Sequence, residues 1–250
     1  MYENQNIAVI IPALDEEKSI ALVVAELIAL KNKDNTTIID EIIVCDNGST
    51  DSTAILAQKA GAQLVYEPQL GYGAACMKAI AAVNESEIIV FVDADQSVEV
   101  KELVLLLDAI IAGHDLVIGS RVLGDALGLL VAGALTPQQR IGNAIASYLM
   151  QFIWREKVTD LGPFRAIRYT GLQQLDMQDK RYGWTVEMQV KAIQSGFKIT
   201  EVPVSSKKRV GHSKISGTLL GTIKAGYDIL TTIAYLWWQD SKKVATTISK

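Results

Sequence analysis

The chain has 250 residues, of which 49% are hydrophobic and 21% charged, and this length is sufficient for one sizeable buried core. Its 24 basic and 28 acidic residues give a formal net charge of −4, which provides no general attraction for nucleic acid. Neither a secretory signal at the first residues nor an uninterrupted apolar run of about 18 residues occurs, so we expect a cytoplasmic protein. The two cysteines, Cys45 and Cys76, lack a metal-binding spacing, and we expect reduced structural thiols.

Strands and helices alternate through the first half of the chain. Short apolar runs predict strands, and apolar residues at helical spacing predict the helices between them. The expected strands cover 7–11, 38–45, 63–66, 88–92 and 116–118. The expected helices cover 19–30, 52–60, 71–83 and 101–112. This alternation predicts an α/β fold with a mostly parallel sheet covered by helices on both faces.

Acidic clusters follow three of the predicted strands, at 15–17, at 46–52 and at Asp93 and Asp95. Because the carboxyl ends of parallel strands meet at one edge of a sheet, we expect these clusters to line one crevice. Asp93 and Asp95 repel each other unless a cation lies beside them, and divalent ions such as Mg²⁺ favour carboxylate oxygens. The alternative is local: Asp95 could cap the helix expected near Val100, and the other carboxylates could cap or begin helices.

Two common nucleotide-binding motifs are absent from the sequence. A dinucleotide-binding fingerprint requires Gly-x-Gly-x-x-Gly after the first strand, where this chain has Pro-Ala-Leu-Asp-Glu-Glu at 12–17. No phosphate-binding P-loop sequence occurs either. A Gly-Tyr-Gly at 71–73 opens a predicted helix and allows close approach of the backbone to a ligand, with Lys78 on the same helix. Together these features favour a metal-assisted nucleotide site.

Four motifs, in this order, resemble those of the inverting family-two glycosyltransferases of GT-A fold. They are Val-Ile-Ile-Pro-Ala-Leu-Asp-Glu-Glu at 9–17, Val-Cys-Asp-Asn-Gly-Ser-Thr-Asp-Ser-Thr at 44–53, Gly-Tyr-Gly-Ala-Ala at 71–75 and Phe-Val-Asp-Ala-Asp at 91–95. Within that family the chain resembles the dolichyl-phosphate mannose and glucose synthase branch, over about residues 7–215. The resemblance implies a Rossmann-like GT-A domain over 1–215, followed by a C-terminal amphipathic helix and tail over 216–250. It also implies a UDP- or GDP-linked sugar donor and Mg²⁺ or Mn²⁺ as cofactor.

The resemblance also implies roles for particular residues. Asp95 would ligate the metal, with Asp93 and His212 as further metal candidates, and Asp93 would also contact the ribose or diphosphate. The residues expected to bind the donor are Pro12, Leu14, Glu16, Asp46, Ser49, Gly71, Lys78, Asp93, Arg121, Trp184 and Lys214. One departure concerns a Gln that the branch carries two positions after the second Asp: this chain has Ser97 there and places Gln96 one position early.

The second half of the chain alternates less regularly. Residues 127–135 are apolar and glycine-rich, which favours a flexible lid or acceptor groove, or else an ordinary buried loop. Thr136 and Pro137 are expected to begin a helix that ends near Phe152. The last helix, expected at 219–238, ends in two tryptophans, so it either packs in the core or lies at a membrane interface.

A basic segment at 207–214 matches the Arg-x-Gly-x-Ser-Lys element of the same branch, which implies that Arg209 contacts phosphate groups. The segments around Asp160 and Glu187 resemble the acceptor side, and both carboxylates are candidate general bases for a hydroxyl acceptor. A phosphate acceptor is already an anion and requires positive charge instead of a base. The basic segment therefore favours inverting hexosyl transfer to a polyprenyl phosphate, with contact at the inner face of the membrane.

Two alternatives stay open at this level. One is transfer to a small soluble hydroxyl compound, and the other is a nucleotide-sugar-binding protein without catalysis, against which the intact Asp93 and Asp95 argue. A donor-hydrolysis assay separates the second alternative from the first. The sequence does not identify the sugar, the nucleobase or the oligomeric state, and a homo-oligomer is one option.

Overall fold

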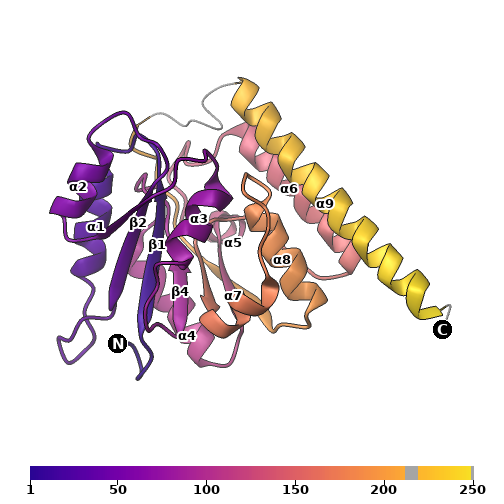
Figure 1. Cartoon of the computed structure of the whole chain (residues 1–250), viewed down its shortest axis with the longest axis horizontal. Helices are drawn as coiled ribbons and strands as arrows, with labels where there is room; N and C mark the ends of the chain where they lie inside the picture. The colour runs from indigo at the N-terminus through magenta and orange to yellow at the C-terminus, as the bar shows by residue number, and fades with distance from the viewer. Residues whose placement is uncertain (212–218, 249–250) are drawn as a thin grey trace.

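The computed structural model describes the backbone of residues 1–211 and 219–248 and the side chains of residues 1–211 and 221–242. Within them a seven-stranded sheet lies between helices, with a long C-terminal helix beside it (Figure 1). The strand order is β3-β2-β1-β4-β6-β5-β7. The strands are β1 (Ile7–Ala13), β2 (Glu41–Asp46), β3 (Gln63–Tyr66), β4 (Ile88–Phe91), β5 (Leu116–Ser120), β6 (Arg165–Arg168) and β7 (Ile199–Pro203).

The described helices follow the strands in the order that the sequence predicts for the first half. They are α1 (Ile20–Ile28), α2 (Thr53–Lys59), α3 (Tyr72–Ile80), the 3-10 helix η1 (Val100–Glu102), α4 (Leu103–Ile111), α5 (Arg121–Ala126), α6 (Pro137–Trp154), α7 (Tyr169–Leu175), α8 (Trp184–Gln194) and α9 (Leu219–Ile248). The sequence did not predict α5, α7, β6 or β7. β6 pairs antiparallel with β4 and β5, and the other strand pairs are parallel. The predicted α/β fold with a mostly parallel sheet is confirmed.

The core lies on both faces of the sheet, and β1 shows how one strand serves both. Ile7, Val9 and Ile11 pack with residues of α1 and α4 on one face. Ala8 and Ile10 pack with residues of α3 and α8 on the other. Side chains alternate across a strand, so a strand covered on both faces must be apolar throughout. Burying each large aliphatic side chain in this way contributes roughly 1.5–3 kcal/mol.

The helix predicted after Thr136 is present and is capped as its sequence suggests. Thr136 Oγ1 accepts a hydrogen bond from Gln139 N at 3.2 Å, and Gln139 Oε1 accepts one from Thr136 N at 2.9 Å. This reciprocal capping box, with Pro137 in the first turn, fixes where α6 begins. The helix ends at Trp154, two residues beyond the expected end, with Arg155 in the left-handed conformation.

The apolar residues 127–135 form a loop, as expected, but an exposed one. Leu127, Leu129 and Val131 all expose their side chains, so the alternative of an ordinary buried loop is wrong. Val131 N donates to the carbonyl of Ser206 at 3.0 Å, which ties this loop to the segment leading to Arg209.

The C-terminal helix α9 extends over 30 residues, ten more than the sequence predicted. Ile233 and Leu236 share a buried cluster with Met150 of α6 and Val186 of α8, and α6 and α9 lie side by side (Figure 1). Trp154 Nε1 donates to Asp240 at 2.7 Å and closes the end of this helix pair. Among the described residues, the helices are too short or too polar to cross a membrane.

Candidate active site

A cavity of about 320 Å³ opens where β1 and β4 end. It is lined by several residues that the sequence predicted for the site. These are Pro12, Leu14, Glu16, Gly71, Asp93, Asp95 and Arg209. The acidic clusters after the first and the central strand therefore do lie together, because parallel β1 and β4 are neighbours in the sheet.

Arg209 joins these two acidic clusters. Its Nη2 lies 2.7 Å from Glu16 Oε1 and its Nη1 lies 3.5 Å from Asp95 Oδ2. The segment that carries it is anchored from behind, since Lys207 N donates to the carbonyl of Ser97 at 2.8 Å and Val210 N to that of Asp95 at 3.0 Å. A guanidinium held in this way places positive charge at the centre of the cavity.

Asp95 does not cap the helix that follows it. Its Oδ1 accepts a hydrogen bond from Ser97 N at 2.9 Å, which closes a local turn, while Glu99 precedes η1 without a side-chain cap. The other carboxylate oxygen, Oδ2, is the one that faces Arg209. One carboxylate thus shapes the loop with one oxygen and presents the other to the cavity.

Asp93 lies deeper in the same wall. Burial, and then the negative charge of Asp95, raises the pKa of Asp93 to about 7, against the opposing effect of Arg121 and Arg209. A cation bound between Asp93 and Asp95 would remove this repulsion, so the pair suits a divalent ion that takes its remaining oxygens from a ligand. No cluster of three or more potential metal ligands occurs among the described residues. The metal candidate His212 and the donor candidate Lys214 lie outside the described residues.

Replacing Asp93 should change how stability depends on pH. Its pKa is raised above the ordinary value of 3.8, so its contribution to stability is complete below that value and is lost as the pH rises through about 7. Asp93→Asn should therefore raise the Tm of the ligand-free protein by about 3 °C at a pH near 8, and by less at a pH near 5. Thermal unfolding followed by circular dichroism at both pH values measures this, and an equal change at both would contradict it.

Gly71 and Gly73 begin α3 where another part of the chain presses against it. A Cβ at Gly73 would collide with the carbonyl of Asp179, and one at Gly71 with that of Lys180. Gly73 N donates to the carbonyl of Arg181 at 3.2 Å and Ala74 N to that of Lys180 at 3.0 Å. The close backbone approach, predicted toward a ligand, is instead made to residues 179–181, and the carbonyls of Lys180 and Arg181 accept from the first amides of the helix.

Glu187 lies behind this segment and does not line the cavity. Its carboxylate accepts hydrogen bonds from Gln178 N at 3.0 Å and Asp179 N at 2.7 Å, and it pairs with Lys191 Nζ at 2.9 Å. Trp184 is likewise buried, edge-on to Phe91 with ring centroids 6.3 Å apart. The structure therefore places both residues beneath the segment that continues into Arg181 and Tyr182 of the cavity wall.

Four other predicted donor residues also lie outside the lining of this cavity: Lys78, Asp46, Ser49 and Arg121, which lines a second cavity. Lys78 is in the last turn of α3. Asp46 Oδ1 accepts from Ser49 N at 3.3 Å, and Ser49 Oγ in turn accepts from Asp15 N at 2.9 Å. Asp46 and Ser49 thus brace the loop after β1, whose Leu14 and Glu16 reach the cavity together with Pro12 near the end of β1.

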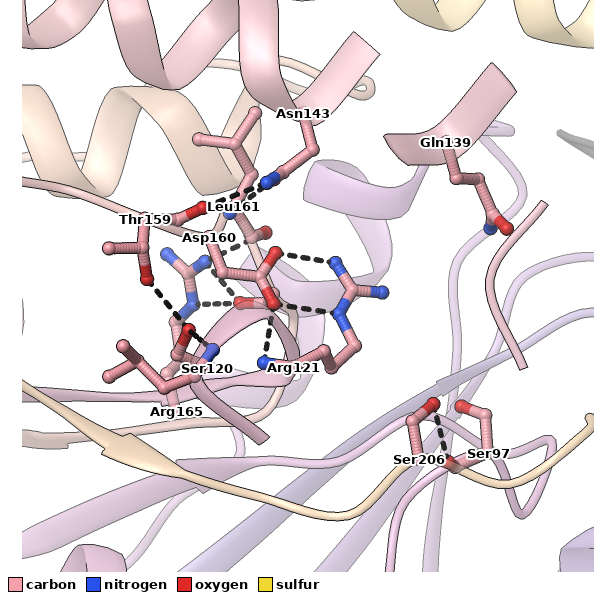
Figure 2. Close-up of polar contacts among 12 residues, drawn as sticks. Ser97, Ser120, Arg121, Gln139, Asn143, Thr159, Asp160, Leu161, Arg165 and Ser206 are labelled. Carbon is pink, nitrogen blue, oxygen red and sulfur yellow. Dashed lines mark hydrogen bonds and ion pairs between the residues drawn. The ribbon is translucent and has the colours of Figure 1, made fainter. Parts of the chain in front are cut away.

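A second cavity, of about 220 Å³, lies between α5, α6 and the segment before β6. Asp160 lies in its wall. Figure 2 shows that Arg121 donates three hydrogen bonds to this carboxylate: Nε to Oδ2 at 2.8 Å, Nη2 to Oδ1 at 2.7 Å and the backbone N to Oδ2 at 2.8 Å. Arg165 donates only to main-chain carbonyls, among them Gly162 at 3.1 Å and Thr185 at 2.9 Å, which fixes the turn after Asp160. Both oxygens of this candidate base are thus engaged by one guanidinium.

Four further residues of the first cavity are not among the site residues expected from the sequence. Asn47 holds the backbone before α3 through Gly71 N, which donates to its Oδ1 at 2.8 Å. Arg181 and Tyr182 come from the segment that Glu187 organises, and Lys224 comes from α9. Asn47 lies within the acidic cluster at 46–52, whereas Arg181, Tyr182 and Lys224 lie far from the acidic motifs in the chain, and only the tertiary structure brings them to the strand ends.

The fold and the site define a class of protein. A cavity at the carboxyl ends of parallel strands, with two adjacent carboxylates and several cationic side chains, is typical of an α/β enzyme that acts on a nucleotide-linked substrate. The family model "Glycosyl transferase family 2" matches residues 8–175. The chain therefore belongs to glycosyl transferase family 2 and is a glycosyltransferase.

Individual relatives agree with this assignment. The chain is 34% identical over 230 residues to an uncharacterized glycosyltransferase of Mycobacterium tuberculosis, covering 91% of this chain and 98% of the relative. It is 28% identical to a dolichyl-phosphate hexose transferase of Haloferax volcanii, covering 86% and 88% of the two chains. A crystal structure of glucosyl-3-phosphoglycerate synthase from Mycobacterium tuberculosis with Mn²⁺, UDP and glucosyl-3-phosphoglycerate superposes with a TM-score of 0.72 at 22% identity, covering 93% and 80%. The protein has the GT-A fold that its motifs implied.

Proposed function

We propose that this glycosyltransferase moves a hexose, with inversion, from a UDP- or GDP-linked donor to a polyprenyl phosphate, with Mg²⁺ or Mn²⁺ as cofactor. The observation that carries the proposal is that both candidate bases, Asp160 and Glu187, already have their carboxylates engaged by other groups of the protein. Asp160 is held in a bidentate ion pair with Arg121, and Glu187 is occupied by two backbone amides and Lys191. A phosphate acceptor, which needs no deprotonation, suits such a site better than a hydroxyl does.

The first cavity suits the donor. Arg181, Arg209 and Lys224 line it together with the two carboxylates, so cations surround the place where a diphosphate would leave. When bound by Asp93 and Asp95, a divalent ion supplies further positive charge for the leaving nucleoside diphosphate. The Mn²⁺ and UDP in the superposed synthase structure support this assignment, and the dolichyl-phosphate hexose transferase supports the acceptor class.

One observation favours a second candidate. The superposed synthase carries a small phosphorylated product, glucosyl-3-phosphoglycerate, which makes a soluble hydroxyl acceptor the main competitor. Asp160 also lines a cavity of its own, where a hydroxyl could reach it if Arg121 moved away. This candidate predicts a water-soluble glycoside.

The purified protein should be incubated with UDP- and GDP-hexoses and Mn²⁺, once with a detergent-dispersed polyprenyl phosphate and once with soluble hydroxyl compounds. We expect sugar label to enter the organic phase, in a product that mild acid cleaves, as a glycosyl phosphate should. Label found only in a soluble glycoside would overturn the proposal in favour of the second candidate. Donor binding without turnover for any acceptor would support a non-catalytic binding protein.

Arg209→Lys should lower kcat/KM by about 10- to 100-fold while the protein remains folded. The guanidinium reaches Glu16 and Asp95 at once, and its buried Nε has no hydrogen-bond partner among the described residues, so it remains available for a phosphate oxygen. A lysine keeps the positive charge but cannot contact two oxygen acceptors with the planar geometry of a guanidinium. Arg155→Lys, an equal change at an exposed position after α6, is the control and should leave kcat/KM unchanged. An Arg209→Lys enzyme with wild-type kinetics would contradict the phosphate role.

A further inference from the structure

The helix pair α6 and α9 exposes many large apolar side chains. On α6 they lie at intervals of three or four residues, and on α9 at intervals of four, three and seven with Trp238 directly after Trp237, which places them along one stripe of each helix. The stripe of α6 consists of Ile141, Ile145, Tyr148 and Phe152, and that of α9 consists of Ile223, Tyr227, Leu230, Trp237 and Trp238. Each is between 45% and 74% exposed. We call these nine residues the α6–α9 surface; apolar surface of this extent marks an interaction site.

The exposed charged side chains that are described on these two helices are basic. Arg140 is the sole charged residue of α6, and its charge is offset by an ion pair with Asp125 of α5 at 2.5 Å. On the described side chains of α9, Asp228 is buried and Asp240 is occupied by Trp154 and Gln194, which leaves Lys224 and Lys242 as the exposed charges. Lys242 Nζ lies 3.7 Å from the centroid of the Trp238 ring. In a chain with a net charge of −4, this helix pair is thus basic and aromatic.

This combination favours a lipid surface over a second copy of the chain. In a symmetric dimer the same surface faces itself, so the lysines of both copies would approach each other without exposed carboxylates on the described part of α9 to pair with them. Anionic headgroups attract exposed lysines, and Tyr and Trp side chains prefer the boundary between headgroups and acyl chains. Because the described helices cannot cross a bilayer, they would lie in its plane.

We infer that the α6–α9 surface docks on an anionic bilayer. Lys224 of α9 lines the donor cavity, and Gln139 and Arg140 of α6 line the second cavity, so docking places both cavities beside the lipid headgroups. A lipid-linked phosphate could then reach the site without leaving the membrane. That consequence rests on the proposed function, whereas the docking itself is measured without donor or acceptor.

The test is co-sedimentation of the full chain with phosphatidylcholine vesicles, with and without phosphatidylglycerol. We expect binding mainly to the anionic vesicles, weakened by salt, and a blue shift of tryptophan emission on binding. Replacing Tyr148, Phe152, Trp237 and Trp238 together by serine should lower the partition coefficient by about tenfold or more. The matched control is Leu22→Ser with Ile55→Ser, two exposed apolar residues of α1 and α2, and it should bind as the wild type does.

A charge variant keeps the test decisive if the serine variant fails to fold. Lys242→Glu should weaken binding to anionic vesicles and leave any binding to neutral vesicles unchanged. Absence of vesicle binding by the wild type overturns the inference, and so does a dimer in sedimentation velocity that Phe152→Ser dissociates. The serine variant should still transfer sugar to a detergent-dispersed polyprenyl phosphate, because this assay needs no docking. If the wild type docks on vesicles but does not transfer sugar to this acceptor, only the proposed function is contradicted.

Discussion

Asp95→Asn should lower turnover by about 1,000-fold while leaving the fold intact. Asparagine can still offer the Oδ1 that accepts Ser97 N, so the turn after β4 is kept. It loses the negative charge on the oxygen that faces Arg209 and the cavity, and with it the affinity for a divalent ion. Steady-state turnover and Mn²⁺-dependent nucleotide binding, measured with circular dichroism as a check on folding, give the result.

The chain provides a matched control. Asp34 Oδ1 accepts Thr36 N at 3.1 Å in the same kind of local turn, on an exposed loop outside both cavities. Asp34→Asn should therefore leave turnover unchanged. Wild-type activity should vanish in a chelator and return with Mg²⁺ or Mn²⁺, and a rate that the chelator does not alter would exclude the metal from the reaction.

Glu187→Ala should reduce both stability and activity, because it removes the acceptor of two backbone amides and takes the carboxylate partner from Lys191, whose other partner is the Asp176 carbonyl. We expect a cost of about 2–4 kcal/mol, which lowers the Tm by roughly 5 °C or more. The donor KM should rise, since the disturbed segment carries Arg181 and Tyr182 into the cavity. Glu187→Gln, which retains one acceptor oxygen, should lie between the alanine variant and the wild type.

Two readouts separate this positioning role from that of a general base. A base would lower kcat in Glu187→Gln while Tm and donor KM stayed at wild-type values, and that outcome would contradict the positioning role. The exposed Glu156→Gln serves as the control for the loss of a charge. Activity of Glu187→Gln alone does not report on the acceptor, because the side chain supports the cavity wall whichever acceptor is used.

Much of the fold could be predicted because the strands and helices of the first half each have a characteristic local pattern of apolar residues. The runs that became β1 and β4 are apolar throughout, which buried parallel strands require. β6 gave no such signal, since its four residues begin with Arg165 and end with Arg168. Arg165 is buried only because carbonyls of Leu161, Gly162 and Thr185 receive its guanidinium, and those contacts form in the folded chain.

The site divides in the same way. Asp93, Asp95 and Glu16 could be placed from the sequence because each directly follows a strand that ends at one edge. Lys224 could not, since nothing in an apolar C-terminal helix indicates which cavity it will reach. Glu187 shows the opposite error: its residue type suits catalysis, but two backbone amides and Lys191 occupy its carboxylate.

The contact between α3 and residues 179–181 has a consequence for recombining family members. The family model ends at residue 175, yet the first amides of α3 find their acceptors beyond it, at Lys180 and Arg181. Consider a chimera that joins residues 1–175 of this chain to the remainder of a relative. The relative's segment must place its backbone carbonyls closely against Gly71 and Gly73. If the incoming segment is displaced even slightly, the wall of the first cavity is lost although every residue of the family motifs is retained. The boundary at which this protein can be recombined therefore lies after the contact of α3 with residues 179–181, and not at residue 175 where the family model ends.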